Sequence, residues 1–317
     1  MKRWKFSDLL QKTKHISYLT QMRVSSYALA SLTALIFSFG VSCSSEYTCH
    51  DAWSEQAGSR RIVDLSVAMH RGETVSLKID IYFEVVVCEI RDIDKKLILS
   101  SLDPDLIDKE IDLLRSSFAP MNVDFFVNEV HPLVEKICVN NASDIEKVLS
   151  EKITEVMNRD DEASCDQKAM NNKRSCSIFF QFSIGKNYAG LSKMPYWENC
   201  RGIRICGPSI HDYLLAHEMG HYFGLQHTFM EGGDNIPDTP NGPILESNIG
   251  TLEDPNFHNI MTYSPNGVER HFTKDQMEYM RKCILGFRYD EMYMYIDTNW
   301  KNKKVSEMVE DAIFNIK

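Results

Sequence analysis

The sequence predicts an α+β fold that opens with a strand, a helix and a second strand. Val75–Ile90 alternates and then becomes continuously apolar, which is typical of a central strand. Pro104–Phe118 has apolar residues at helical spacing and a proline in its first turn, and residues 122–130 alternate again as a strand. The third observation is the segment 217–227, where histidines at helical spacing precede a glycine. These features predict strands and helices mixed within one fold.

The other elements are assigned from periodicity and composition. In chain order we expect a charged helix, a polar loop, a strand and the histidine-bearing helix. An irregular segment rich in Gly, Pro, Asp and Asn follows, then a closing helix and an aromatic-rich segment that ends in an amphipathic helix. Their ranges are 143–157, 158–174, 177–184, 210–223, 229–256, 273–285 and 288–317.

The composition is that of an acidic globular protein. The chain has 317 residues, enough for one large domain or two modest ones. Its hydrophobic fraction of 43% and charged fraction of 25% are ordinary for a folded chain. The net charge of −10 argues against a nucleic-acid partner, because phosphate binding needs a basic surface.

Residues 1–43 are predicted to be an export signal. Basic residues precede an apolar run over 27–41 that is shorter than the roughly 20 residues of a membrane span. Cys43 lies where a bacterial lipoprotein is cleaved and acylated, although Gly40 replaces the usual leucine. A lipoprotein, a secreted protein and an uncleaved anchor remain alternatives, and Met22 is an alternative start. We therefore expect the protein to be secreted or attached to the cell surface, touching a membrane only through this segment.

Residues 44–73 are polar and are predicted to be a linker or a short pro-segment. The chain has nine cysteines, which fits an oxidising compartment and predicts disulfides. If Cys43 is lipidated, the remaining even number allows four bridges. The candidate pairs that are closest in sequence are Cys165/Cys176 and Cys200/Cys206.

The segment 217–227 has the pattern of a catalytic metal site. His217 and His221 are four residues apart, so a helix places both imidazoles on one face. Gly224 can turn the chain through a positive φ and bring His227 back as a third ligand. Three neutral nitrogens around Zn²⁺ leave a fourth position for water, and Glu218 is the natural general base for that water. A buried helix with incidental histidines is the competing interpretation, and the full pattern argues against it.

At these residues the sequence resembles the metzincin metalloproteases. Residues 259–263 hold Met261 at a distance that suits the metzincin methionine turn. The tripeptides at 227–229 and 238–240 are similar to the pappalysin branch, although cysteines usual near the latter and after the turn are absent here. The resemblance implies a metzincin-like α+β fold: a twisted, mostly parallel sheet with an active-site helix and a backing helix, then an irregular lower subdomain with a closing helix.

The resemblance also implies roles for further residues and domain boundaries. Tyr263 would reach the metal or the oxyanion, and Met261 would form an apolar floor beneath the histidines. An edge strand near residues 188–191 would pair with extended substrate. Asp234 and Asp238 are candidate Ca²⁺ ligands, with solvated loop acids as the alternative. The metalloprotease catalytic domain would span 74–286, with a C-terminal extension over 287–317.

The function expected from these features is a zinc-dependent endopeptidase that acts on protein or peptide substrates. Two alternatives belong to other classes. A metallopeptidase with a downstream glutamate as third ligand is disfavoured by Gly224 and His227. A catalytically degenerate surface binding protein of metzincin fold would lack a ligand or the base, and all four residues are present.

Overall fold

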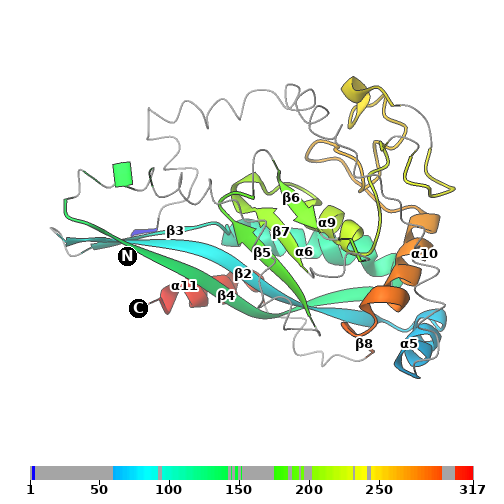
Figure 1. The fold of residues 1–317 in the computed structure, drawn as a ribbon, viewed down its shortest axis with the longest axis horizontal. Coiled ribbons are helices and arrows are strands. Elements are labelled where there is room, and N and C mark those ends of the chain that lie inside the picture. The colour runs from blue at the N-terminus through cyan, green and yellow to red at the C-terminus, as the bar shows by residue number, and fades with distance from the viewer. Residues whose placement is uncertain are drawn as a thin grey trace.

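The structure is a computed structural model. It describes residues 2–3, 60–91, 95–141, 144, 147–148, 151, 175–184, 188–192, 194–195, 202–230, 233–240, 244–294 and 304–316. Its architecture is a mixed β-sheet packed against helices, with a long irregular segment between the active-site helix and the closing helix (Figure 1). The predicted α+β class is therefore confirmed.

One long strand organises the sheet. β2 (Val75–Ile90) pairs with the parallel strand β4 (Val123–Val139) along its whole length. Its other edge pairs in succession with β8 (Met292–Tyr293), β5 (Cys176–Gln181) and β3 (Lys95–Ser100). The sheet continues from β5 through the parallel strand β7 (Ile203–Cys206) to the antiparallel strand β6 (Gly190–Ser192) at its far edge. At the opposite end, β1 (Lys2–Arg3) pairs with β3. β2 is therefore the strand that connects all parts of the sheet.

The helices α6 (Pro104–Phe118) and α9 (Leu214–Tyr222) pack on each other and on this sheet. α6 begins where sequence signals predict, because Asp103 caps it and Pro104 occupies its first turn. α10 (Lys274–Cys283) begins with a capping box between Thr273 and Gln276. The short helical elements are η3 (Ala119–Met121), η6 (Gly207–Ser209), η7 (Glu246–Asn248) and the π-helix η8 (Ile284–Arg288).

A single large apolar core joins these layers. On β2, alternate residues from Leu77 to Phe83 are fully buried, and they belong to the same core cluster as Leu114 of α6 and Met219 of α9. A smaller cluster at the other end of β2 includes Cys88. Because α9 and α6 share the main core, the active-site helix has a fixed position relative to the sheet.

Within the stretch 44–73, predicted as a linker or short pro-segment, residues 60–70 are helical. These residues form α5 (Arg60–His70), the helix at the lower right of Figure 1, which contacts β2 and η8. Ile62, Leu65, Ala68 and Met69 recur at helical spacing, and all four are buried in the main core. Arg61 also donates to the backbone oxygen of Met292 at 2.9 Å. Exposed residues lie between these buried ones, so the apolar face of the helix is difficult to recognise from the sequence alone.

The region 287–317, predicted as an extension, is integrated into the fold within its described part. β8 pairs with β2, and α11 (Val305–Phe314) packs on α6 and β4. Val305 and Val309 are buried, and Asp108 of α6 accepts from the backbone nitrogens of Val305 and Ser306. The final amphipathic helix is confirmed, and its apolar face explains why it packs on the sheet.

Several element bounds differ from the sequence prediction. β4 extends well past residue 130, because its additional residues continue to pair with β2. β3 was not predicted, and it is an antiparallel partner of the second half of β2. The active-site helix begins at Leu214 rather than at residue 210. The predicted helix over 143–157 and the loop over 158–174 lie largely outside the described residues.

The two candidate disulfide pairs are also wrong, because Cys176 and Cys206 are free thiols. Cys176 lies in the core on β5, where burial raises the pKa of its thiol. The Cys206 thiol contacts the backbone oxygen of Phe182 at 3.6 Å. Both thiols are therefore buried in the interior.

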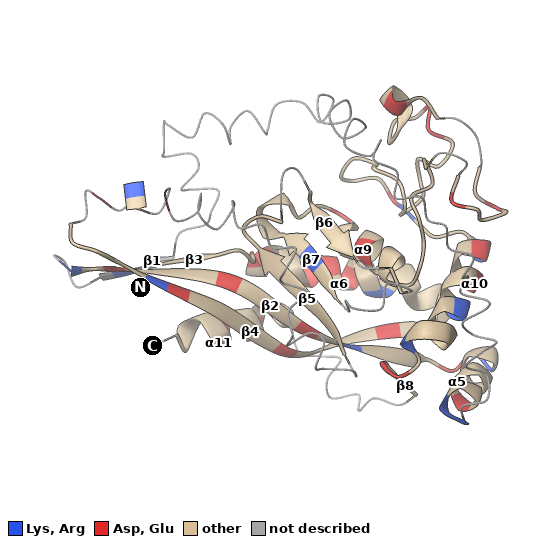
Figure 2. Ribbon diagram, in the orientation of Figure 1, with Lys and Arg blue, Asp and Glu red and all other residues tan. Residues whose placement is uncertain are grey.

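Charged residues are spread over the surface elements. Figure 2 shows acidic residues on β2, β4 and α10, and basic residues on α5 and α10. Among the described residues, none of the helices has the length and apolar character needed to cross a membrane.

Candidate active site

The first turn of α9 is held from outside the helix. Tyr213 has a positive φ of 66° and its side chain provides no cap. Instead, the buried carboxylate of Glu110 on α6 accepts from the backbone nitrogen of Leu215 at 3.1 Å. Burial raises the pKa of Glu110 to about 7, and the backbone hydrogen bond at Leu215 opposes that rise. A carboxylate from the neighbouring helix therefore replaces the missing local cap.

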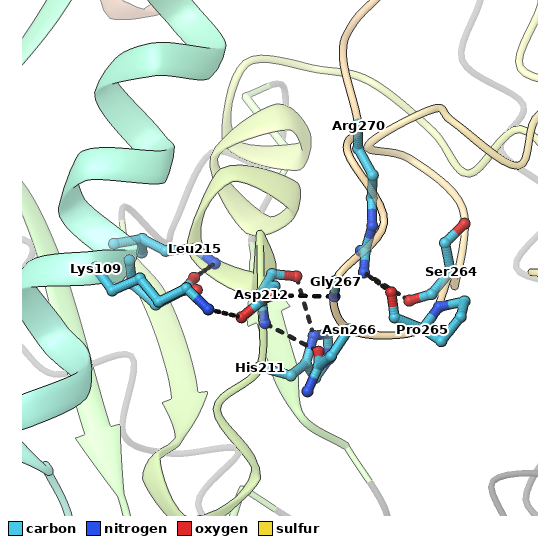
Figure 3. Close-up of polar contacts among 10 residues, drawn as sticks. Lys109, His211, Asp212, Leu215, Ser264, Pro265, Asn266, Gly267 and Arg270 are labelled. Carbon is cyan, nitrogen blue, oxygen red and sulfur yellow. Dashed lines mark hydrogen bonds and ion pairs between the residues drawn. The ribbon is translucent and has the colours of Figure 1, made fainter.

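A polar cluster at Asp212 connects this turn to two other parts of the fold (Figure 3). The Asp212 carboxylate accepts from Lys109 Nζ at 2.5 Å and from the backbone nitrogen of Gly267 at 3.2 Å. Its own backbone nitrogen donates to Asn266 Oδ1 at 3.1 Å. Arg270 donates to the backbone oxygens at 264 and 265, which fixes the same loop. Asp212 thus holds the loop that follows residue 263 against the start of α9.

The other end of α9 closes with a tight turn at Gly224. The backbone nitrogen of Gly224 donates to His221 O at 2.9 Å, and that of Leu225 donates to Gly220 O at 3.0 Å. This pair of bonds is a Schellman motif, which needs a left-handed residue at the position of Gly224. Its φ is 99°, as the sequence predicted. The chain then reverses and carries His227 back towards the helix.

The three predicted histidines converge on one point. The Nε2 atom of His227 lies 3.1 Å from Nε2 of His217 and 3.1 Å from Nε2 of His221. Two ligands at 2.0–2.1 Å from a tetrahedral ion would be about 3.3 Å apart. Among the described residues, this is the one group of three or more His, Cys, Asp or Glu side chains with metal-ligand spacing.

The protonation of these rings favours a cation between them. His217 Nδ1 lies 2.7 Å from Ile260 O, and His221 Nδ1 lies 2.7 Å from Leu225 O. Each Nδ1 must carry the proton to donate to a carbonyl, so both Nε2 atoms present lone pairs. Burial lowers the pKa of His221 to about 4 and the pKa values of His217 and His227 well below 6.5. Neutral nitrogens facing one another at these distances fit a bound metal such as Zn²⁺.

Glu218 lies on α9 between the two helical histidines and is only 4% exposed. Burial raises the pKa of its carboxyl to about 8. Its Oε2 atom has no hydrogen-bond partner among the described residues. The side chain therefore has a strong affinity for a proton and an unoccupied acceptor, as a general base requires.

The methionine turn lies against these residues. Met261 is fully buried, and an added Cβ on Gly220 would lie 2.6 Å from its sulfur, so the turn packs closely on α9. The Tyr263 ring contacts that of Phe229 at an interplanar angle of 53°, and its hydroxyl lies 3.3 Å from His227 Nε2. Tyr263 is 58% exposed as a residue, but desolvation of its hydroxyl beside the histidines and the nearby charge of Glu218 raise its pKa, so Tyr263 remains protonated. The structure thus brings Met261 and Tyr263 to the histidines.

Asp234 and Asp238 lie away from this centre and serve the closing helix. Asp234 accepts from the backbone nitrogen of Ile236, the hydroxyl of Thr239 and the amide of Gln276. Asp238 accepts from the hydroxyl of Thr273 at 2.6 Å and from the backbone nitrogen of Asp275 at 2.9 Å. Their carboxylates thus connect the irregular segment to α10, and the calcium assignment stays a prediction.

The sequence prediction missed the buried polar group beneath the end of α9. The Tyr222 hydroxyl donates to Glu291, and the guanidinium of Arg288 lies 3.8 Å from the centre of the Tyr222 ring. Arg288 and Glu291 are 2% and 0% exposed and form an ion pair of 3.4 Å. Glu110 was also missed, although its place between Ile107 and Ile111 on an apolar helix face is a signal of a buried carboxylate.

Comparison with known proteins agrees with this site. Residues 209–285 match the model of the peptidase family described as pregnancy-associated plasma protein-A. The predicted resemblance to the pappalysin branch is therefore confirmed over the segment that holds the histidines, the methionine turn and α10.

Two similar proteins are fungal. An extracellular metalloprotease of Pyricularia oryzae is 38% identical over 141 residues, which are 36% of this chain and 50% of that protein. Another, from Colletotrichum graminicola, is 38% identical over 86 residues, 23% of this chain and 31% of that protein. The chain thus matches half or less of the length of these relatives. A solved structure of mirolysin in complex with compound 9 has 16% identity and a TM-score of 0.45, covering 73% of this chain and 99% of that one.

Proposed function

We propose that this protein is a zinc-dependent endopeptidase. The observation that carries the proposal is the convergence of three histidine Nε2 atoms, two of them oriented by backbone carbonyls, beside a buried unpaired glutamate. The similarity of residues 209–285 to a peptidase family supports the same reaction class. His217, His221 and His227 are the proposed ligands.

The site supplies the parts that peptide hydrolysis needs. Zinc, when bound, acidifies a coordinated water and polarises the scissile carbonyl. Glu218 would accept the proton of the attacking water and deliver it to the leaving amine. Tyr263, which remains protonated, donates a hydrogen bond to the developing oxyanion. Met261 provides the apolar support beneath the histidines.

The substrate would be an extended protein or peptide segment. β6 lies at the edge of the sheet and is adjacent to α9, so its free edge is the proposed place for a substrate strand. We propose that residues 60–316 form one catalytic unit, since α5, β8 and α11 share its core. We retain the surface binding protein as the alternative, and activity measurements separate the two.

We also propose a location and further ligands. The fungal relatives are named as extracellular, which supports export of this chain by a signal over 1–43. Acylation of Cys43 is proposed from sequence alone, and the disulfide-bonded Cys283 supports the proposal that the protein contains disulfides. The same holds for a Ca²⁺ at Asp234 and Asp238, whose oxygens have hydrogen-bond donors in the structure.

The experiment measures zinc and proteolysis in matched variants. Glu218→Gln should keep one zinc per chain and lower kcat on a casein panel about 10²- to 10⁴-fold, because the base is lost. His221→Ala should lose most of the zinc as well. Glu246→Gln, an exposed acid in η7, is the control and should behave as the wild type. Equal proteolysis by wild type and Glu218→Gln would remove the peptidase proposal, and stoichiometric zinc in His221→Ala would contradict the ligand assignment.

A further inference from the structure

The edge strand β6 approaches the proposed base at one residue, Gly190. A Cβ placed on Gly190 would lie 2.3 Å from Glu218 Oε1 and 2.6 Å from both Cδ and Cγ of that side chain. Distances below 3.0 Å do not occur for real Cβ atoms, so any larger residue at 190 would require a shift. The Glu218 carboxylate therefore occupies the space that a side chain at 190 would fill.

The backbone does not explain a glycine here. Gly190 is not among the described glycines with positive φ, and it pairs with Ile205 in an ordinary antiparallel register. The neighbouring backbone is also regular, because Cys206 N donates to Ala189 O at 2.8 Å. A residue in such a strand can be of any type as far as its conformation is concerned. The constraint at 190 comes from Glu218.

Glu218 in turn has little else to fix its carboxylate. Its Oε2 atom is buried without a hydrogen-bond partner among the described residues. Its backbone is fixed in α9, so the carboxylate can move only by changing side-chain rotamer. Packing against the bare backbone at Gly190, rather than hydrogen bonding, limits that choice.

We propose that Gly190 is a positioning residue for Glu218. By lacking a side chain, it leaves the space that the Glu218 carboxylate occupies beside the edge strand β6. A methyl group at 190 would force the carboxylate into another rotamer while leaving the three histidines and their carbonyl partners unchanged. This inference rests on the proposed function for its catalytic part, whereas the contact itself is independent of activity.

The contact is tested by a double-mutant cycle of thermal unfolding on the zinc-loaded full chain. The four proteins are the wild type, Gly190→Ala, Glu218→Ala and the double variant. Overpacking should lower the Tm of Gly190→Ala by about 3–6 °C. In the Glu218→Ala background the added methyl has room, so Gly190→Ala should change Tm by less than about 1 °C. Equal losses in the two backgrounds would overturn the proposal.

The catalytic role is tested by zinc content and by kcat and KM on one peptide substrate. Gly190→Ala should retain zinc and keep KM within about 3-fold, while kcat falls by about 10²-fold because the base is displaced. A wild-type kcat in Gly190→Ala would also overturn the proposal. If Gly190→Ala does not fold but the double variant does, the contact is supported, and if neither folds it is contradicted. An inactive wild type would reject the proposed function, and the Tm cycle would still decide the contact.

Discussion

The two ends of α9 are held in different ways, although they support the same group of histidines. At its start, Lys109 and Asp212 form an ion pair whose side chains are 55% and 20% exposed. At its end, Arg288, Glu291 and Tyr222 form a polar group that is almost completely buried. Exposed charges contribute little to the free energy of unfolding, whereas a buried charge that loses its partner destabilises the fold strongly. The stability of the fold therefore depends on the buried end of α9, while the exposed end positions the loop at Asn266 and Gly267.

The largest expected effect comes from breaking the buried end. Glu291→Ala leaves the Arg288 guanidinium without its carboxylate in the interior, which should reduce the free energy of unfolding by about 3–5 kcal/mol. Urea denaturation measures the loss. Tyr222→Phe is the matched control, since it removes one hydroxyl and should cost only about 1 kcal/mol. A smaller loss for Glu291→Ala than for Tyr222→Phe would reverse our ranking of these contacts.

The second prediction concerns Glu110, which is buried but serves the exposed end. Its folded pKa of about 7 lies above the usual 4.5, so the folded protein binds this proton more tightly than the unfolded chain. Stability from this group is therefore complete below about pH 4.5 and falls as pH rises towards 7, by about 3 kcal/mol in all.

Glu110→Gln should remove this pH dependence, because an amide does not titrate. Its oxygen can still accept from the backbone nitrogen of Leu215, so the hydrogen bond to α9 is kept. The measurement compares urea denaturation of the two proteins at pH 5 and pH 8, since zinc and all other groups are common to both. The wild type should lose about 3 kcal/mol more than the variant between these values. If both proteins lose the same free energy of unfolding between pH 5 and pH 8, burial does not destabilise the charged form of Glu110, and the prediction is wrong.

A third change acts on the turn beyond the buried end. Gly224→Val places a β-branched residue at a φ of 99°, which should cost about 1–3 kcal/mol or force the turn to move. Because His227 follows this turn, zinc affinity should fall much more than the stability of the metal-free protein. Competition with a chelator and thermal unfolding in its presence measure the two quantities. Wild-type zinc affinity in this variant would mean that the turn does not direct His227.

The smallest effect is expected at the exposed ion pair. Lys109→Met should change the free energy of unfolding by less than about 1 kcal/mol, and the difference should shrink in 1 M salt because exposed charges are screened. Asp212 would retain its bond from Gly267, so zinc content should be unchanged. A salt-independent loss of several kcal/mol would place this pair with the buried contacts instead.

The sequence predicted what depends on local pattern. The convergence of the histidines at 217, 221 and 227, the positive φ of Gly224 and the bounds of β2 and α6 follow from spacing, cap residues and periodicity, and the structure agrees. Tertiary partners were not predictable in this way. Nothing near Gly190 in sequence indicates that Glu218 fills the space beside it.

The same limit applies to Arg288 and Glu291. These residues follow α10 and read as surface charges, and only the fold places them under Tyr222. α5 was missed because Val63 and Val67, which lie between its core residues, are apolar but exposed, so the buried face does not stand out in the sequence. Sequence pattern therefore identified the chemistry of the site better than the contacts that hold it.

The shared strand β2 has a consequence for the order of folding. Its last residues pair with β3, the next strand along the chain, whereas its middle and first residues pair with β5 and β8, which come much later in the sequence. Contacts between residues distant in sequence form slowly, because the entropy cost of closing a long loop comes before the contacts that stabilise it. We expect β2 amides to exchange with solvent only by global unfolding, and the segment 244–258 to exchange by local opening. Hydrogen exchange that is equally fast in both would show that β2 is not the last element to open.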